Sequence, residues 1–232
     1  MITWDRFESA VRSYPEIANY DQSYEELMGN KELIEILKTK PGLKEIHKVI
    51  EFLNRWRCRI KSGNESAKIL LSVILENLQL LNILRNYNIE HVDFDKKIYG
   101  NNFDLKVKDF IILLYSKFRH VHFKFGATAT AKILHILIPE LFIMWDNDIL
   151  KNYQRRNIGV SDSAPGYVDF LISMKSLAAE INNKFKSAEL HLSGKGKDPA
   201  SYLSIVMNYN PPKTLAKFLD EYNWVTITRN NV

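Results

Sequence analysis

Apolar residues recur every three or four positions along most of this chain, which is the period of an α-helix. The 9 glycines and 7 prolines, residues that interrupt helices, fall between these periodic stretches. We therefore expect about nine to eleven helices. The ranges with the clearest pattern start near 3, 30 and 41 and continue over 65–87, 104–118, 126–137, 147–154, 167–185, 199–208 and 212–222.

The segment 88–102 is irregular by comparison, and although it has room for a short strand, nothing in it alternates cleanly between apolar and polar positions. No internal repeat, low-complexity tract or long linker divides the chain. The sequence predicts an all-α, multi-helix fold in which residues 1–232 form one unit.

Composition supports a protein with its own hydrophobic core. Apolar residues make up 46% of the chain and aromatic residues 12%, which is enough to bury a substantial interior. Cys58 is the single cysteine, so an internal disulfide and a cysteine-ligated iron–sulfur cluster are both excluded. This usage favours a reducing compartment.

The N-terminal residues include Asp5 and Glu8 where a signal peptide would carry a basic region and then an apolar run. The longest apolar stretches, 69–84 and 133–145, are interrupted by polar side chains and by Pro139, and they are typical of buried helices rather than membrane spans. We expect a cytoplasmic or nucleoid-associated protein without a membrane partner.

The formal net charge is +5 and the isoelectric point is near 9.1, which suits a partner with phosphates but also occurs in proteins that bind no nucleic acid. Four cations lie between Arg55 and Lys61. A run of this kind more often forms a solvated face at a helix C-terminus than a phosphate site, and we interpret it in that way.

Metal and nucleotide motifs are not found. His120 with His122, and Asp93 with Asp95, lack the spacing of a strong metal site. The glycine-rich segment 193–199 does not have the residue order of a phosphate-binding Walker loop. The sequence therefore predicts no metal and no cofactor.

The segment 122–149 carries the most informative pattern. A turn at Gly126 follows a predicted helix, a helix of small residues begins at Ala127, and Asp146 follows an apolar stretch. Small side chains allow close backbone approach, and free amides at a helix start can face an anion such as a DNA phosphate.

This pattern resembles the helix-hairpin-helix DNA glycosylase superfamily over roughly residues 121–153. The family has a hairpin ending in glycine, a helix of small residues and an aspartate about 20 positions further on, which is the separation of Gly126 and Asp146. The resemblance implies two packed lobes with the 119–153 region at the cleft between them. It also implies that Asp146 is the catalytic carboxylate, which supports cleavage of the N-glycosidic bond.

Two positions depart from the family pattern. Lys124 stands where the first hairpin glycine is expected, and Thr128 stands where bifunctional members place their Schiff-base lysine. Lys132 is nearby but out of register with that lysine. The chain therefore resembles the monofunctional type, which releases a base without lyase chemistry.

Further residues follow from the resemblance as site candidates. The predicted nucleic-acid contacts are Lys124, Gly126, Thr128, Lys132, Lys151, Arg155 and Arg156, and the predicted base pocket consists of Phe123, Phe125 and Trp145.

A non-catalytic alternative fits the same residues. The chain would then be a helical module that binds nucleic acid or protein, and Asp146 would only cap the following helix. The damaged base, the choice of DNA or RNA and the oligomeric state stay open at the level of sequence.

Overall fold

The computed structural model describes residues 2–18, 20–61, 63–100, 103–120, 125–156 and 159–229, and these ranges confirm an all-α, multi-helix fold. They contain twelve α-helices, one short 3-10 helix and one pair of strands. The α-helices are α1 (Trp4–Ile17), α2 (Asp21–Gly29), α3 (Lys31–Thr39), α4 (Leu43–Arg55), α5 (Asn64–Glu76), α6 (Leu78–Leu84), α7 (Val107–His120), α8 (Ala127–Leu137), α9 (Asn147–Arg155), α10 (Ala164–Ser187), α11 (Pro199–Val206) and α12 (Leu215–Arg229).

Two helices are additional to those that the periodicity predicts. Helix α2 was not expected, and the single helix predicted over 65–87 is divided at Asn77 into α5 and α6, whose axes differ by 63°. Asn77 ends α5 by donating from its side-chain amide to the Val73 carbonyl at 2.7 Å, so a polar side chain replaces the usual glycine or proline at the break.

No helix in the described ranges is by itself long and apolar enough to cross a membrane. Within those ranges, the bent pair of α5 and α6 is the one combination that reaches the required length and composition.

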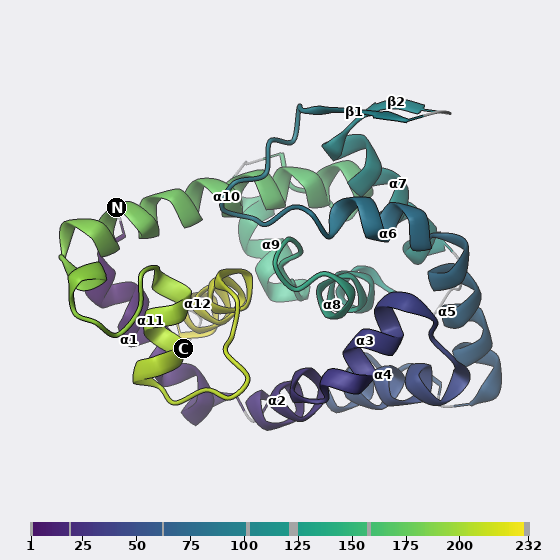
Figure 1. The fold of residues 1–232 in the computed structure, drawn as a ribbon, viewed down its shortest axis with the longest axis horizontal. Helices are drawn as coiled ribbons and strands as arrows, with labels where there is room; N and C mark the ends of the chain where they lie inside the picture. The colour runs from purple at the N-terminus through teal and green to yellow at the C-terminus, as the bar shows by residue number, and fades with distance from the viewer. Residues whose placement is uncertain are drawn as a thin grey trace.

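The segment predicted to be irregular holds a small hairpin. Strands β1 (Lys97–Gly100) and β2 (Phe103–Lys106) pair in antiparallel register, with Lys97 opposite Lys106. The hairpin lies at one edge of the molecule, beside the start of α7 (Figure 1).

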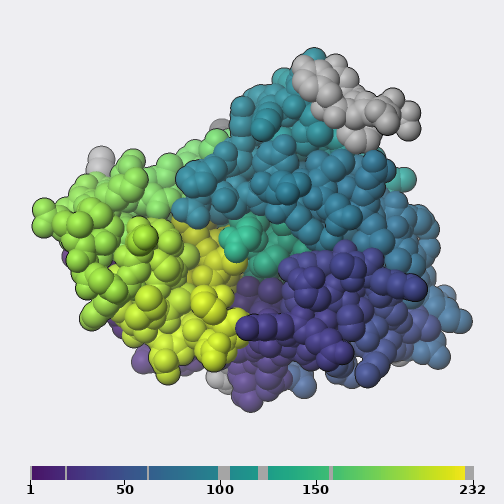
Figure 2. All heavy atoms as spheres, in the orientation of Figure 1, coloured from purple at the N-terminus to yellow at the C-terminus, as the bar shows by residue number. Residues whose placement is uncertain are grey.

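Helix α8 occupies the middle of the structure. Figure 1 shows α8 and α9 between a group formed by α1, α11 and α12 and another formed by α2 to α6. Every residue of α8 except Thr128 is buried, and the helix contacts α3, α4 and α7. The surrounding helices cover most of this centre in the space-filling view (Figure 2).

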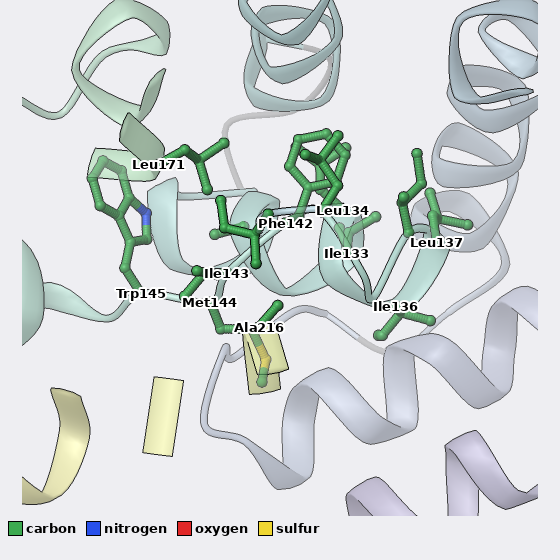
Figure 3. Close-up of a cluster of buried hydrophobic side chains, with 14 of the residues drawn as sticks. Ile133, Leu134, Ile136, Leu137, Phe142, Ile143, Met144, Trp145, Leu171 and Ala216 are labelled. Atoms are coloured by element: carbon green, nitrogen blue, oxygen red, sulfur yellow. The ribbon is translucent and has the colours of Figure 1, made fainter. Parts of the chain in front are cut away.

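One hydrophobic cluster runs through nearly all helices, and a close-up shows its central part around α8, Phe142 and Trp145 (Figure 3). The two ends of the chain meet in it, because α1 packs along α12. This pairing places residues from both ends beside the start of α8 and α9, where the candidate site lies.

Candidate functional site

A pocket of about 640 Å³ lies where four segments converge: the N-termini of α8 and α9, the turn that follows α4, and helix α12. Its volume is within the range of small-molecule and cofactor sites. It brings Gly126, Thr128 and Asp146 together, so the three residues at the centre of the sequence pattern share one space.

The N-terminus of α8 opens on this pocket without a cap. Gly126 precedes the helix, and no side chain of the described residues bonds to the first amides. Three amides at the start of a helix, here those of Ala127, Thr128 and Ala129, have no acceptor inside the helix, and the helix dipole makes this end attractive to an anion.

Gly126 itself has no conformational need to be glycine. Its φ of −63° and ψ of 173° are available to any residue, and a Cβ atom there would meet only a guanidinium nitrogen of Arg119 at 3.8 Å. Neither the backbone angles nor the described neighbours therefore require glycine at this position. At the edge of a pocket, the missing side chain lets a ligand approach the main chain closely.

Asp146 caps α9 from the same pocket. Its Oδ1 accepts hydrogen bonds from the amides of Asp148 at 2.9 Å and Ile149 at 2.8 Å. Both bonds end on Oδ1, and no group in the described part of the chain donates to Oδ2. The residue is half-buried and lines the pocket, so its carboxylate is fixed by the helix and still accessible.

Residues 56–60 form a turn that we call the rim turn. Arg57 and Arg59 extend from it into solvent at the pocket edge, and both have left-handed backbone conformations with φ of 58° and 53°. Such angles cost energy for residues with a side chain. The turn is held in place by Asn54, whose side chain donates to the Ile60 carbonyl at 2.9 Å and accepts from the Ile60 amide at 2.7 Å.

Lys132 connects α8 to the rim turn from inside. The residue is buried, and its Nζ donates to the Trp56 carbonyl at 3.1 Å and lies 5.0 Å from the centre of the Trp56 ring. Lys132 is part of the pocket lining. The sequence predicts that it contacts nucleic acid, and in the structure its ammonium group also bonds within the protein.

Aromatic rings surround the pocket. Tyr20 packs against Trp56 with ring centres 5.2 Å apart, and Trp224 meets Tyr14 edge to face at 5.6 Å. Tyr20 and Trp224 are only partly buried, so they present surface on which a planar ligand can stack.

The aromatic residues named from sequence are placed differently. Trp145 is 1% exposed; its ring packs against Tyr115, Tyr167 and Phe170, and its Nε1 donates to the Ala127 carbonyl at 3.2 Å. Trp145 belongs to the buried hydrophobic cluster (Figure 3) and also lines the pocket. Phe125 is also buried and is not part of the lining.

Helix α12 lines the pocket with Asp220 and Trp224, and we call these two residues and the buried Lys217 that pairs with Asp220 the inner wall. Lys217 is fully buried, and its Nζ lies 3.1 Å from Asp220 Oδ2 and 3.0 Å from Glu221 Oε1. Glu221 also pairs at 2.9 Å with buried Lys213. The inner wall therefore rests on a network of buried ion pairs.

Burial and the neighbouring charges shift the pKa values of this network. It raises the pKa of Asp220 above its usual value, and the positive charge of Lys217 only partly offsets that effect. Burial alone would lower the pKa of Lys217, but nearby acidic groups, Glu221 first among them, raise it well above the usual value. Lys217 therefore stays protonated and remains a hydrogen-bond donor.

The other predicted cations lie away from the pocket. Lys151, Arg155 and Arg156 are exposed in the later part of α9 or just beyond it, whereas Asp146 caps its first turn. Arg156 lies 5.7 Å from the Tyr153 ring centre and lines a second hollow beside α10 and α12. Phe123 and Lys124 fall outside the described residues.

Sequence reasoning missed Arg59, Asp220 and Trp224 as pocket residues. It interpreted the cations after α4 as a solvated face, yet Arg57 and Arg59 are both exposed and at the pocket, while Arg55 pairs with Glu26 at 2.6 Å. Charged residues inside the apolar pattern of α12 were a signal that could have identified the inner wall.

Among the described residues, no group of three or more His, Cys, Asp or Glu side chains could hold a metal ion. Comparisons with protein-family models, with curated proteins and with solved structures find no match to this chain.

Proposed function

We propose that this chain binds DNA and that its pocket receives a single base turned out of the duplex, where Asp146 supports hydrolysis of the N-glycosidic bond. The observation that carries the proposal is the meeting of an uncapped helix N-terminus, two exposed arginines and an accessible carboxylate at one pocket of about 640 Å³. The resemblance to helix-hairpin-helix glycosylases rests on two of the same residues, Gly126 and Asp146.

The charges around the pocket suit a nucleotide in a strand. Phosphates lie outside the base, and the cations at the pocket edge, Arg57 and Arg59, are exposed with no fixed partner among the described residues. The free amides at the start of α8 add a second anion-binding element. Between these groups, the partly exposed rings of Tyr20 and Trp224 can stack on a base, as required by enzymes that extrude one.

Asp146 supplies the chemistry in this proposal. As the base leaves, positive charge develops on the sugar, and a carboxylate held in place beside it stabilises that charge or activates a water molecule. The cap bonds occupy Oδ1 and leave Oδ2 for the reacting centre. Thr128 at the edge of the pocket offers no amine, which suits a monofunctional reaction.

A non-catalytic DNA-binding module is the second candidate, and the cap geometry favours it. The two hydrogen bonds to Asp146 Oδ1 are a sufficient structural reason for an aspartate at this position. The two functions differ in whether the negative charge of Asp146 matters beyond the cap.

The test is base release from duplexes that carry single lesions, scored by alkaline cleavage of the abasic sites, with wild type and Asp146→Asn. Asparagine is as good a helix cap as aspartate, so the variant retains the fold and loses only the charge. We expect release by the wild type and a fall of at least about a hundredfold in the variant.

Asp148→Asn is the matched control, because Asp148 lines the same pocket but is exposed and its side chain makes no cap bond. It should keep release within a few-fold of wild type. If wild type releases no base across a broad panel while salt-dependent DNA binding persists, the non-catalytic module replaces the glycosylase.

A further inference from the structure

Asp220 is the most deeply placed carboxylate of the pocket. The residue is only 5% exposed, yet it lines the cavity from the inner wall, one helical turn before Trp224 on the same face of α12. Asp146 and Asp148, by comparison, lie nearer to solvent.

The two oxygens of the Asp220 carboxylate differ in their hydrogen bonds. Oδ2 accepts from Lys217 Nζ at 3.1 Å, and Lys217 is held in turn by Glu221 at 3.0 Å. No group among the described residues donates to Oδ1. Because Asp220 lines the pocket and Oδ1 is not among the atoms sealed from solvent, a donor from a molecule in the pocket can reach this oxygen in place of water.

Among the described cations at and around the pocket, only Lys217 bonds to this carboxylate. Lys132 donates to the Trp56 carbonyl, while Arg57 and Arg59 lie in solvent at the edge. The deep end of the pocket therefore presents an acceptor, whereas the outer end presents donors and positive charge.

We propose that Asp220 determines specificity by accepting a hydrogen bond from the exocyclic amine of the base that enters the pocket, and that Lys217 is its positioning residue. This inference rests on the proposed function of the pocket as a base site. It names the substrate class as amino-bearing bases, and it requires no further group and no metal.

Pairs of free bases that differ by one amine provide the test: adenine against purine, and guanine against hypoxanthine. Binding to the full chain is measured by equilibrium dialysis. A hydrogen bond to a charged acceptor predicts that wild type prefers the amino-bearing member of each pair by at least about tenfold.

Asp220→Asn should abolish or invert this preference. Lys217 can only donate, so it will hold the amide oxygen and turn the amide NH₂ toward the pocket, where it faces the amine donor to donor. Asp148→Asn removes a charge from the same pocket without touching Lys217, and it should leave the preference unchanged.

The outcomes separate this inference from the proposed function. Binding of all four bases by wild type without preference overturns the role of Asp220 and leaves the pocket as a base site, whether or not the variant folds. Binding of none of them overturns both. Equal loss of preference in the two variants would also contradict the inference, since it would reflect net charge alone.

Discussion

The rim turn and the inner wall both border one pocket, but their charged side chains are held in position in opposite ways. Arg57 and Arg59 are hydrated and their positions are set by the backbone, at the cost of two left-handed residues. Lys217 and Asp220 are buried, and their positions are set by each other. An exposed charge needs no partner in the protein, whereas a buried one does, so only the inner wall depends on charge for stability.

The largest effect should follow from breaking the inner wall. Lys217→Ala leaves Asp220 and Glu221 buried without this cation and should lower the free energy of unfolding by about 3 to 5 kcal/mol. Chemical denaturation measures the loss.

Two variants sharpen that result. Lys217→Met restores most of the volume but not the charge, so it should remain strongly destabilised if the ion pairs matter more than packing. Arg57→Ala should change stability by no more than about half a kcal/mol. Equal losses in Lys217→Ala and Arg57→Ala would remove the distinction between the two walls.

The buried polar network should also give the protein a pH dependence. His135 lies behind the inner wall; its Nδ1 donates to the Phe142 carbonyl at 2.6 Å, so its Nε2 accepts from the Tyr24 hydroxyl at 2.9 Å. Burial lowers the pKa of His135 from 6.5 to about 4. Between these values the unfolded chain binds a proton that the folded chain does not, so stability falls as the pH falls.

The titration of His135 should lower the free energy of unfolding by about 3 kcal/mol between pH 6.5 and pH 4. The raised pKa of Asp220 acts in the opposite direction, so the quantity to compare is the difference between wild type and His135→Gln. Urea unfolding over this pH range should give a difference that shrinks toward acid pH. A constant difference would show that His135 titrates alike in both states.

The smallest effect on stability should come from the rim turn, and it should have the opposite sign. Replacing both Arg57 and Arg59 by glycine relieves the left-handed backbone and should raise the free energy of unfolding by about 1 kcal/mol. The same double variant should bind DNA less tightly, with the slope of log affinity against log salt reduced by about 0.9 per lost phosphate contact.

The double alanine variant separates the two consequences. It removes the same charges but keeps the unfavourable angles, so the salt slope should fall while stability does not rise. An unchanged slope in both variants would exclude the rim turn from the DNA interface.

Periodicity was sufficient to predict the helical class because most helices bury a single apolar face. It failed where a helix breaks inside an apolar run, as at Asn77, because both α5 and α6 continue the pattern and only a side-chain bond marks the end.

The candidate site was predictable only in its local part. Gly126 and Asp146 belong to one continuous segment, so their spacing indicated a shared location. Asp220 and Arg59 line the same pocket but lie far apart in the sequence. The residues next to each of them in the sequence give no sign that the two come together. A charged residue in a helix is normally assigned to solvent, and Lys217 contradicts that rule because its partners are buried with it.

The pairing of α1 with α12 has a consequence for synthesis. Helix α1 precedes the other described helices in the sequence and its main packing partner, α12, follows all of them, so the apolar face of α1 lacks that partner while the helices between them are synthesised. The inner wall follows the other segments of the pocket in the sequence, and the pocket cannot be complete on any nascent chain that lacks α12. Binding competence is thus acquired in a single late step rather than built up as the polypeptide grows.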